Sequence, residues 1–173
     1  MITKDMPQEE VLKLAPACAC TKCEHGCKYG SGAFAKGEDE IAAKAFGMSA
    51  EQFRTQYLEE IEKFNTTLWR PKIQREKGKP YGQCIFFNAT KGCTIHAVKP
   101  MECKTAMGCT PEGEALNVWF TINNFVNPND PQSVRQYAAY LREGGKTLPG
   151  AALHDLVKDS NLLKKILAFE IVR

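Results

Sequence analysis

The sequence predicts a mostly α-helical fold with a small irregular β-hairpin region, and three observations support this. Hydrophobic residues recur at helical spacing through residues 110–173, which contain no cysteine. All eight cysteines lie between residues 18 and 109, where glycine and proline interrupt the periodic segments. A hydrophobic fraction of 43% over 173 residues suits one domain with its own core. We therefore expect a single domain over 1–173, with a cysteine-rich region at 18–109 and a helical region at 110–173.

The first half of the chain contains start and stop signals for three helices. Residues 7–14 predict a short helix, and residues 38–46 predict another that ends at Gly47. Ser49 and Gln52 form a capping-box pattern that begins the third. Its predicted apolar stripe is Phe53, Tyr57, Ile61 and Phe64.

Two segments of this half have the composition of irregular structure. Residues 15–37 are rich in Cys, Gly and Ala and predict a loop. Residues 70–80 are polar, basic and interrupted by proline and glycine, so we expect an exposed connector. A solvated loop is the simpler interpretation of this connector. The alternative is a contact for an acidic partner or RNA, with Trp69 and Tyr81 stacking on bases.

The second group of cysteines lies among short strand-like runs. Residues 85–87 and 94–96 predict two strands, and residues 88–92 predict the hairpin loop between them. A short turn or helix that carries Cys103 is expected to begin at Lys99.

Residues 110–173 predict three helices. Thr110 followed by Pro111 has the pattern of an N-cap with proline at the first helical position. Asp130 and Pro131 cap a second helix, and Ser160 is expected to cap the last. The residues expected to face the core from the first of these helices are Leu116, Trp119, Phe120 and Phe125.

Charge and hydropathy argue against a dedicated nucleic-acid-binding protein and against a membrane protein. The net charge of +3 and pI near 8.4 fall short of the basic balance of a dedicated nucleic-acid binder. The N-terminus has no apolar stretch, and no apolar run approaches the ~18 residues of a membrane span. We therefore expect a cytoplasmic protein without membrane contact. Thiols stay reduced in the cytosol, so eight cysteines favour metal or redox chemistry over disulfides.

The first cysteine group contains a strong metal-binding motif. Two residues separate Cys20 from Cys23, a spacing that lets both thiolates turn toward one metal, and Cys27 follows three residues later. Cys18 is too close to Cys20 to bind the same metal comfortably, so it is either a ligand of a second site or a spare thiol.

The second group, Cys84, Cys93, Cys103 and Cys109, supplies single ligands from separate elements. This arrangement favours a [4Fe–4S] cluster, in which each iron takes one thiolate, over zinc, which usually takes two paired knuckles. Zinc remains the alternative. Eight thiols could serve two four-ligand centres, or one centre with spares or a redox pair.

With both groups in view, the chain resembles the YkgJ-like cysteine-cluster family, the CxxCxxCC zinc- or iron-chelating domain. The matching pieces are Cys20-x2-Cys23-x3-Cys27, Cys84-Ile-Phe-Phe, Gly92-Cys93-Thr-Ile-His96 and Lys99-Pro-Met-Glu-Cys103-Lys104. They cover residues 18–109, about half the chain. Lys28 stands where the family has the second cysteine of a pair. The resemblance implies metal binding by the matched cysteines and no catalytic residue.

Three functional hypotheses follow. The first is an iron–sulfur protein with an electron-transfer or redox role for a protein partner. We expect His25 to support the site or face solvent and His96 to pack beside it, with metal ligation as the alternative for each. The second is a zinc-stabilised module that binds protein or RNA. The third is an enzyme, either a metal-dependent oxidoreductase or a relative of the flagellin lysine methylases, which are similar to this chain only in the cysteine region.

Overall fold

The computed structural model describes residues 1–15, 21–106 and 110–170, apart from the side chains of 21–23. Helices dominate and three small antiparallel sheets interrupt them, which confirms the predicted fold class. The helices are α1 (Gln8–Leu14), α2 (Thr21–Tyr29), α3 (Glu38–Ala45), α4 (Ala50–Tyr57), η1 (His96–Val98, a 3-10 helix), α5 (Met101–Thr105), α6 (Gly113–Phe125), α7 (Pro131–Arg142), α8 (Leu153–Leu156) and α9 (Ser160–Leu167). The strands are β1 (Leu58–Lys63), β2 (Thr66–Pro71), β3 (Ile73–Arg75), β4 (Gly82–Cys84), β5 (Phe87–Asn88) and β6 (Gly92–Cys93).

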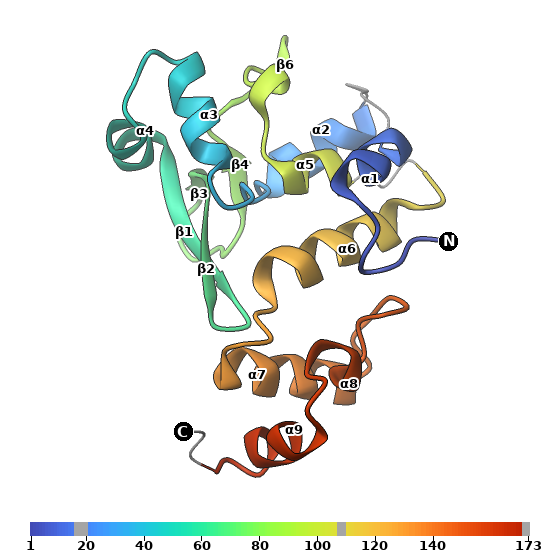
Figure 1. Cartoon of the computed structure of the whole chain (residues 1–173). Coiled ribbons are helices and arrows are strands. Elements are labelled where there is room, and N and C mark those ends of the chain that lie inside the picture. The colour runs from blue at the N-terminus through green and yellow to red at the C-terminus, as the bar shows by residue number, and fades with distance from the viewer. Residues whose placement is uncertain (16–20, 107–109, 171–173) are drawn as a thin grey trace.

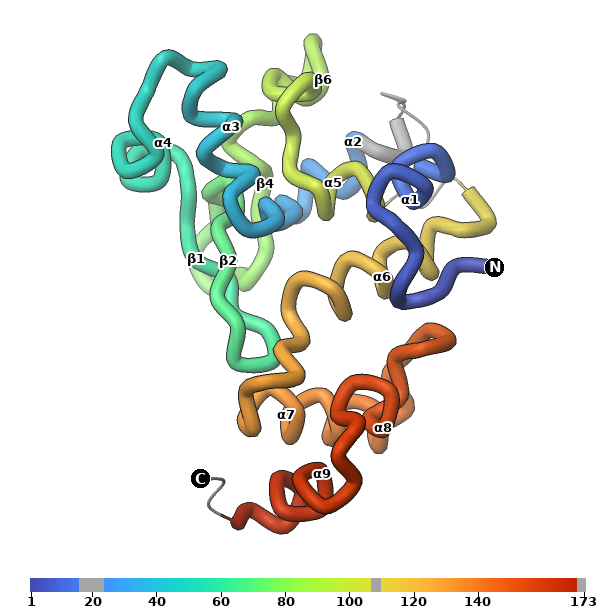
Figure 2. Tube along the Cα trace, in the orientation of Figure 1, coloured from blue at the N-terminus to red at the C-terminus, as the bar shows by residue number. Residues whose placement is uncertain are grey.

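The long helix α6 lies between the cysteine-rich part of the molecule and the C-terminal helices (Figure 1). It contacts α5 and β2 near the cysteines, while α7, α8 and α9 follow its C-terminal end. The tube in Figure 2 shows α2–α5 and β6 toward the opposite end from α9, while the turn of the β1–β2 hairpin reaches down to α7. None of the helices in the described ranges is long and apolar enough to cross a membrane.

Three hydrophobic clusters hold these parts together, and the smallest joins α7 to α9 through Val134, Val157 and Ile166. The largest joins α1, α6 and α7 through buried residues that include Val11, Leu116, Phe120 and Tyr137. The second cluster lies beneath the hairpins and includes Phe34, Phe53, Phe86, Ile95 and Cys84. Because Cys84 belongs to this second core, part of the cysteine region has a rigid apolar support.

The helix predicted after Ser49 begins as expected and ends earlier. The Ser49 hydroxyl accepts from the Gln52 N–H and the Gln52 side chain accepts from the Ser49 N–H, which confirms the capping box. The prediction that the helix continues through Ile61 and Phe64 is wrong, because the chain becomes strand β1 at Leu58. Phe64 and Asn65 both have positive φ and form the two-residue turn that pairs β1 with β2. Pairing with β2 thus makes residues 58–63 a strand, although Ile61 and Phe64 continue the helical spacing of Phe53 and Tyr57.

The predicted loop at 15–37 is also wrong over residues 21–29, which form α2. Gly26 lies inside this helix, where glycine is unfavourable by about 0.5–1 kcal/mol relative to alanine. Contacts of α2 with β4, β5 and β6 supply tertiary stabilisation that local composition does not reveal.

The predicted connector at 70–80 is partly ordered. It contains the end of β2 and all of β3, and β3 pairs with β4. Arg70 and Arg75 both bind the Glu59 carboxylate, at 2.8 Å in each case. Trp69 is partly buried, with the Arg54 guanidinium 5.6 Å from its ring centroid. Much of the predicted basic surface is therefore engaged within the fold.

The remaining elements agree with the sequence to within a few residues. The hairpin around 88–92 is confirmed as β5–β6, with only Phe87 of the predicted strand 85–87 inside β5. The predicted strand at 94–96 is wrong, because β6 ends at Cys93 and His96 begins the 3-10 helix η1. The helix expected from Thr110 instead begins at Gly113, with Glu112 as its N-cap. Asp130 caps α7 as predicted, and Asp159, one residue before Ser160, caps α9. The core-facing residues predicted for α6, namely Leu116, Trp119, Phe120 and Phe125, are all buried.

Candidate metal centre

Four cysteines from separate elements line one cavity of about 380 Å³. Cys27 comes from α2, Cys84 from β4, Cys93 from β6 and Cys103 from α5. Cys84 is buried, and the other three are partly exposed. Residues up to 76 positions apart in the chain, from Cys27 to Cys103, thus meet at one place, a grouping that the sequence pattern left open.

Hairpins and helix contacts position three of these cysteines. Phe87 lies three residues after Cys84, and in the β5–β6 hairpin it pairs with Cys93. Helix α2 packs across β4, β5 and β6, which places Cys27 against the same hairpins. Both Cys27 and Cys93 pack against the hydrophobic cluster that includes Cys84. The wall of the cavity is therefore continuous with the core.

Cys103 is positioned by the segment that precedes α3. The Gly32 N–H donates to Cys103 Sγ at 3.3 Å, and the Ala33 N–H donates to Glu102 Oε2 at 2.7 Å. Glu102 also pairs with Lys63 Nζ of β1 at 3.0 Å. A Cβ at Gly32 would lie 2.8 Å from both the backbone nitrogen and the Sγ of Cys103, so this close approach requires glycine.

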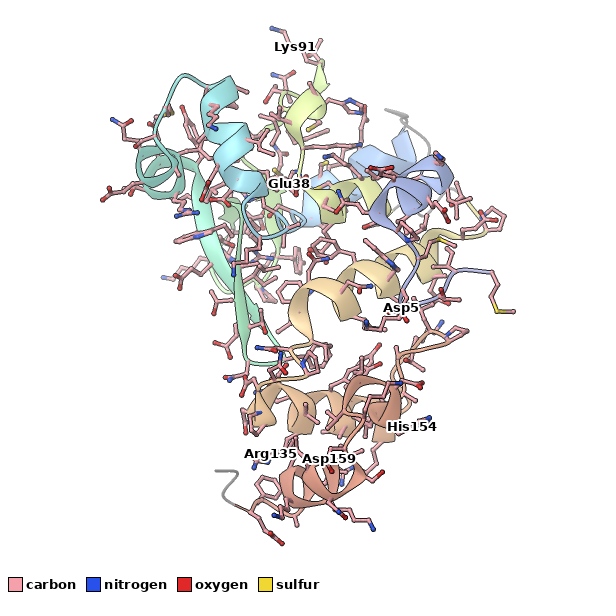
Figure 3. The ribbon with its side chains drawn as sticks, in the orientation of Figure 1. Asp5, Glu38, Lys91, Arg135, His154 and Asp159 are labelled. Atoms are coloured by element: carbon pink, nitrogen blue, oxygen red, sulfur yellow. The ribbon has the colours of Figure 1, made fainter. Side chains whose placement is uncertain are left out.

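Glu38 makes a second connection to α5. Its Oε2 accepts from the Ala35 N–H at 3.0 Å and from the Met101 N–H at 2.8 Å, and its Oε1 pairs with Lys104 at 2.9 Å. Figure 3 shows Glu38 where α3 faces α5. One carboxylate thus satisfies the first N–H of α5 and fixes the helix that carries Cys103.

Burial raises the pKa of the Cys84 thiol to about 11. Backbone hydrogen bonds from Phe86 and Phe87 oppose this rise, while the neighbouring Cys27 and Cys93 add to it. The thiol therefore stays protonated at neutral pH when no metal is bound, and a metal would displace its proton. Backbone N–H groups directed at the sulfur would stabilise the resulting thiolate.

Burial also raises the pKa of the Cys103 thiol well above its ordinary range. The hydrogen bond from the Gly32 N–H opposes this rise, and the proximity of Cys84, Cys27 and Glu102 adds to it.

The other predicted ligands are described incompletely or not at all. Cys18, Cys20 and Cys109 lie outside the described residues, and only the backbone of Cys23 is described. Cys23 and Cys27 stand four residues apart in α2, so the two backbone positions fall on the same side of the helix.

The two histidines expected beside the site occupy different environments, and charged side chains also line the cavity. His25 is exposed and stacks near Tyr29, with ring centroids 4.9 Å apart, whereas His96 lines the cavity. Glu102 and Lys99 also line it. Lys99 belongs to the Lys99-Pro100-x-x-Cys103 motif, which marked it as a neighbour of the site. No motif in the sequence marked Glu102.

Within the described ranges, no group of three or more His, Cys, Asp or Glu side chains is arranged to hold a single metal ion. A mononuclear zinc site requires four donors at about 2.0–2.3 Å from one point. In a multi-iron cluster each thiolate binds a different iron, so the sulfur ligands stand further apart. The described residues place Cys27, Cys84, Cys93 and Cys103 in the lining of one cavity of about 380 Å³.

Comparison of the chain with protein-family models, curated proteins and solved structures gives no match. The resemblance to the YkgJ-like family therefore stays a prediction that rests on the cysteine motifs.

Proposed function

We propose that the protein holds an iron–sulfur cluster of the [4Fe–4S] type in the cysteine cavity and passes electrons to a protein partner. The observation that carries the proposal is the convergence of Cys27, Cys84, Cys93 and Cys103 on one cavity. Cysteine thiolates are the usual ligands of such clusters, and a [4Fe–4S] cluster takes four.

The backbone around the sulfurs supports thiolate ligation. Cys103 Sγ receives a hydrogen bond from the Gly32 N–H at 3.3 Å, and the backbone of Phe86 and Phe87 opposes the rise that burial causes in the pKa of the Cys84 thiol. Hydrogen bonds to cluster sulfurs are among the features that set reduction potential. An ordinary buried thiol has little need for such donors, because a neutral sulfur is a weak acceptor.

When bound, the cluster would supply one-electron redox chemistry. The residues of the chain would hold it, exclude water and set its charge environment. Phe86 and Ile95 belong to the apolar core beneath the cavity, whereas Tyr29 lines it and is about half exposed. One wall of the cavity is thus shielded and the other lies near the surface, as electron exchange with a partner requires.

Anaerobic purification with iron and sulfide analysis and a visible spectrum tests this proposal. We expect a coloured protein with about four irons and four sulfides per bound cluster, and a loss of cluster in Cys84→Ser and Cys103→Ser. Cys18→Ser provides the comparison, because Cys18 is the weakest predicted ligand. Colourless, iron-free protein after reconstitution with iron and sulfide would end the proposal.

Zinc analysis and treatment with a chelator test the zinc alternative. Stoichiometric zinc in aerobically purified protein, together with unfolding on addition of a chelator, would favour a zinc-stabilised module. Full retention of structure after complete zinc removal would count against that alternative.

A further inference from the structure

Lys99 is a buried lysine in the wall of the cysteine cavity. Lys99 is only 9% exposed and lies between η1 and α5. Lysine is rarely buried this far unless its charge is paired, because removing an ammonium group from water is costly. The partner of the Lys99 charge is therefore informative.

The hydrogen-bond partner of Lys99 is an imidazole and not a carboxylate. Its Nζ lies 3.4 Å from His96 Nε2, which must carry a lone pair to accept from an ammonium. Lys63 and Lys104 nearby are different, since they pair with Glu102 and Glu38. Among the described residues no carboxylate lies within salt-bridge distance of Lys99, although Glu24 and Glu102 also line the cavity.

We propose that the Lys99 ammonium is the counter-charge of the metal–thiolate centre and raises the reduction potential of that centre. This inference rests on the proposed function. Four thiolates make an iron–sulfur centre net anionic, and reduction makes it more so. A positive charge in a site of low dielectric stabilises the reduced state more than the oxidised state.

The redox step leaves Lys99 chemically unchanged. The cluster takes one electron from a low-potential donor, such as dithionite in the experiment below, and the donor is oxidised. No bond forms or breaks at Lys99. His96 holds the Lys99 side chain toward the cavity through their hydrogen bond.

Three variants isolate the effect of charge. Lys99→Met removes the charge and keeps most of the side-chain length, and Lys99→Arg keeps the charge. Lys91→Met is the matched control, because Lys91 is an exposed residue at the β5–β6 hairpin and points into solvent (Figure 3). A solvated charge is screened and contributes little.

The experiment is an anaerobic potentiometric titration of reconstituted protein, followed by electron paramagnetic resonance. We expect Lys99→Met to disfavour the reduced cluster about tenfold, which is about 59 mV for a one-electron couple. Lys99→Arg should recover most of this shift, and Lys91→Met should stay near wild type. An unchanged potential in Lys99→Met, or an equal shift in Lys91→Met, would overturn the inference.

Failure to take up the cluster is informative in two cases. If Lys99→Met takes up no cluster, recovery of the cluster in Lys99→Arg supports the charge role, and equal loss in Lys99→Arg overturns it. If wild-type protein itself takes up no cluster, the proposed function fails before the variants are compared, and this inference falls with it.

Discussion

The Gly32 N–H lies 3.3 Å from Cys103 Sγ, although the two residues are 71 positions apart in the chain. This contact joins the segment after α2 to α5 and so fixes two walls of the cysteine cavity. It depends on the absence of a side chain at Gly32, because a Cβ there would meet Cys103 N and Sγ at 2.8 Å.

Gly32→Ala is therefore expected to separate the segment from α5. The overpacking should lower the free energy of unfolding by about 1–3 kcal/mol and reduce the iron retained by the protein. Gly30→Ala is the matched control, since a Cβ at Gly30 has nothing within 4 Å. Urea denaturation and iron analysis of both variants provide the measurement. Equal stability and iron content in the two variants would contradict the role assigned to Gly32.

A second substitution tests α2, the helix that replaces a predicted loop. Gly26 lies inside α2, and a Cβ there would have open space. Gly26→Ala should therefore stabilise the protein by about 0.5–1 kcal/mol, because alanine loses less backbone freedom in a helix. A loop with a glycine-specific conformation would give the opposite sign.

Gly37→Ala is the companion control for that experiment. Gly37 is the N-cap of α3 and has a φ of 82°, a conformation that alanine adopts only with strain. This variant should be destabilised in the same urea assay, which shows that the sign of a glycine substitution follows local geometry.

Glu102 is expected to stabilise the fold through two bonds. Its carboxylate accepts from the Ala33 N–H at 2.7 Å and from Lys63 at 3.0 Å, and the residue is buried. Glu102→Ala would leave both donors without their acceptor, at a cost of about 1–3 kcal/mol. Glu114→Ala removes an exposed partner of Lys146 and should cost under about 1 kcal/mol. Thermal unfolding of the two variants measures the difference, and similar costs would argue against the connection through Glu102.

Local signals in the sequence predicted the starts of α4 and α7 correctly. The Ser49 capping box and the Asp130 cap act between residues two or three positions apart, so they are visible in the sequence itself. The strand β1 was missed because its stability comes from pairing with β2 and from the turn at Phe64 and Asn65. Ile61 fits a helical stripe as well as a strand, and only the partner decides.

The cysteines of the candidate site were identified as candidate ligands from the sequence, whereas the residues that support them were not. Cysteine spacing identified Cys27, Cys84, Cys93 and Cys103, which the fold brings to one cavity. The supporting groups could not be predicted, because Gly32 and Glu102 act on residues about 70 positions away. Residues 74–80 of the predicted connector are exposed as expected. The pairing of Arg70 and Arg75 with Glu59 was not predicted, because Glu59 lies outside the connector in the sequence.

Cys84 gives the stability of the metal-free protein a specific dependence on pH. Burial raises its pKa from an ordinary 9.0 to about 11 in the folded state. Between these two values the unfolded chain loses the thiol proton while the folded protein keeps it, so ionisation favours the unfolded state. The stabilisation is complete below pH 9 and is lost as the pH rises through about 11, with a total of about 2–3 kcal/mol.

Urea denaturation of metal-free, reduced protein from pH 8 to 11 tests this expectation. Wild type should lose stability more steeply than Cys84→Ala, because lysines and tyrosines that titrate in the same range are common to both. Parallel pH profiles would mean that Cys84 ionises as readily in the folded state as in the unfolded state. The same proton must leave when a metal binds, so metal affinity should rise with pH in wild-type protein over the range in which the stability of the metal-free form falls.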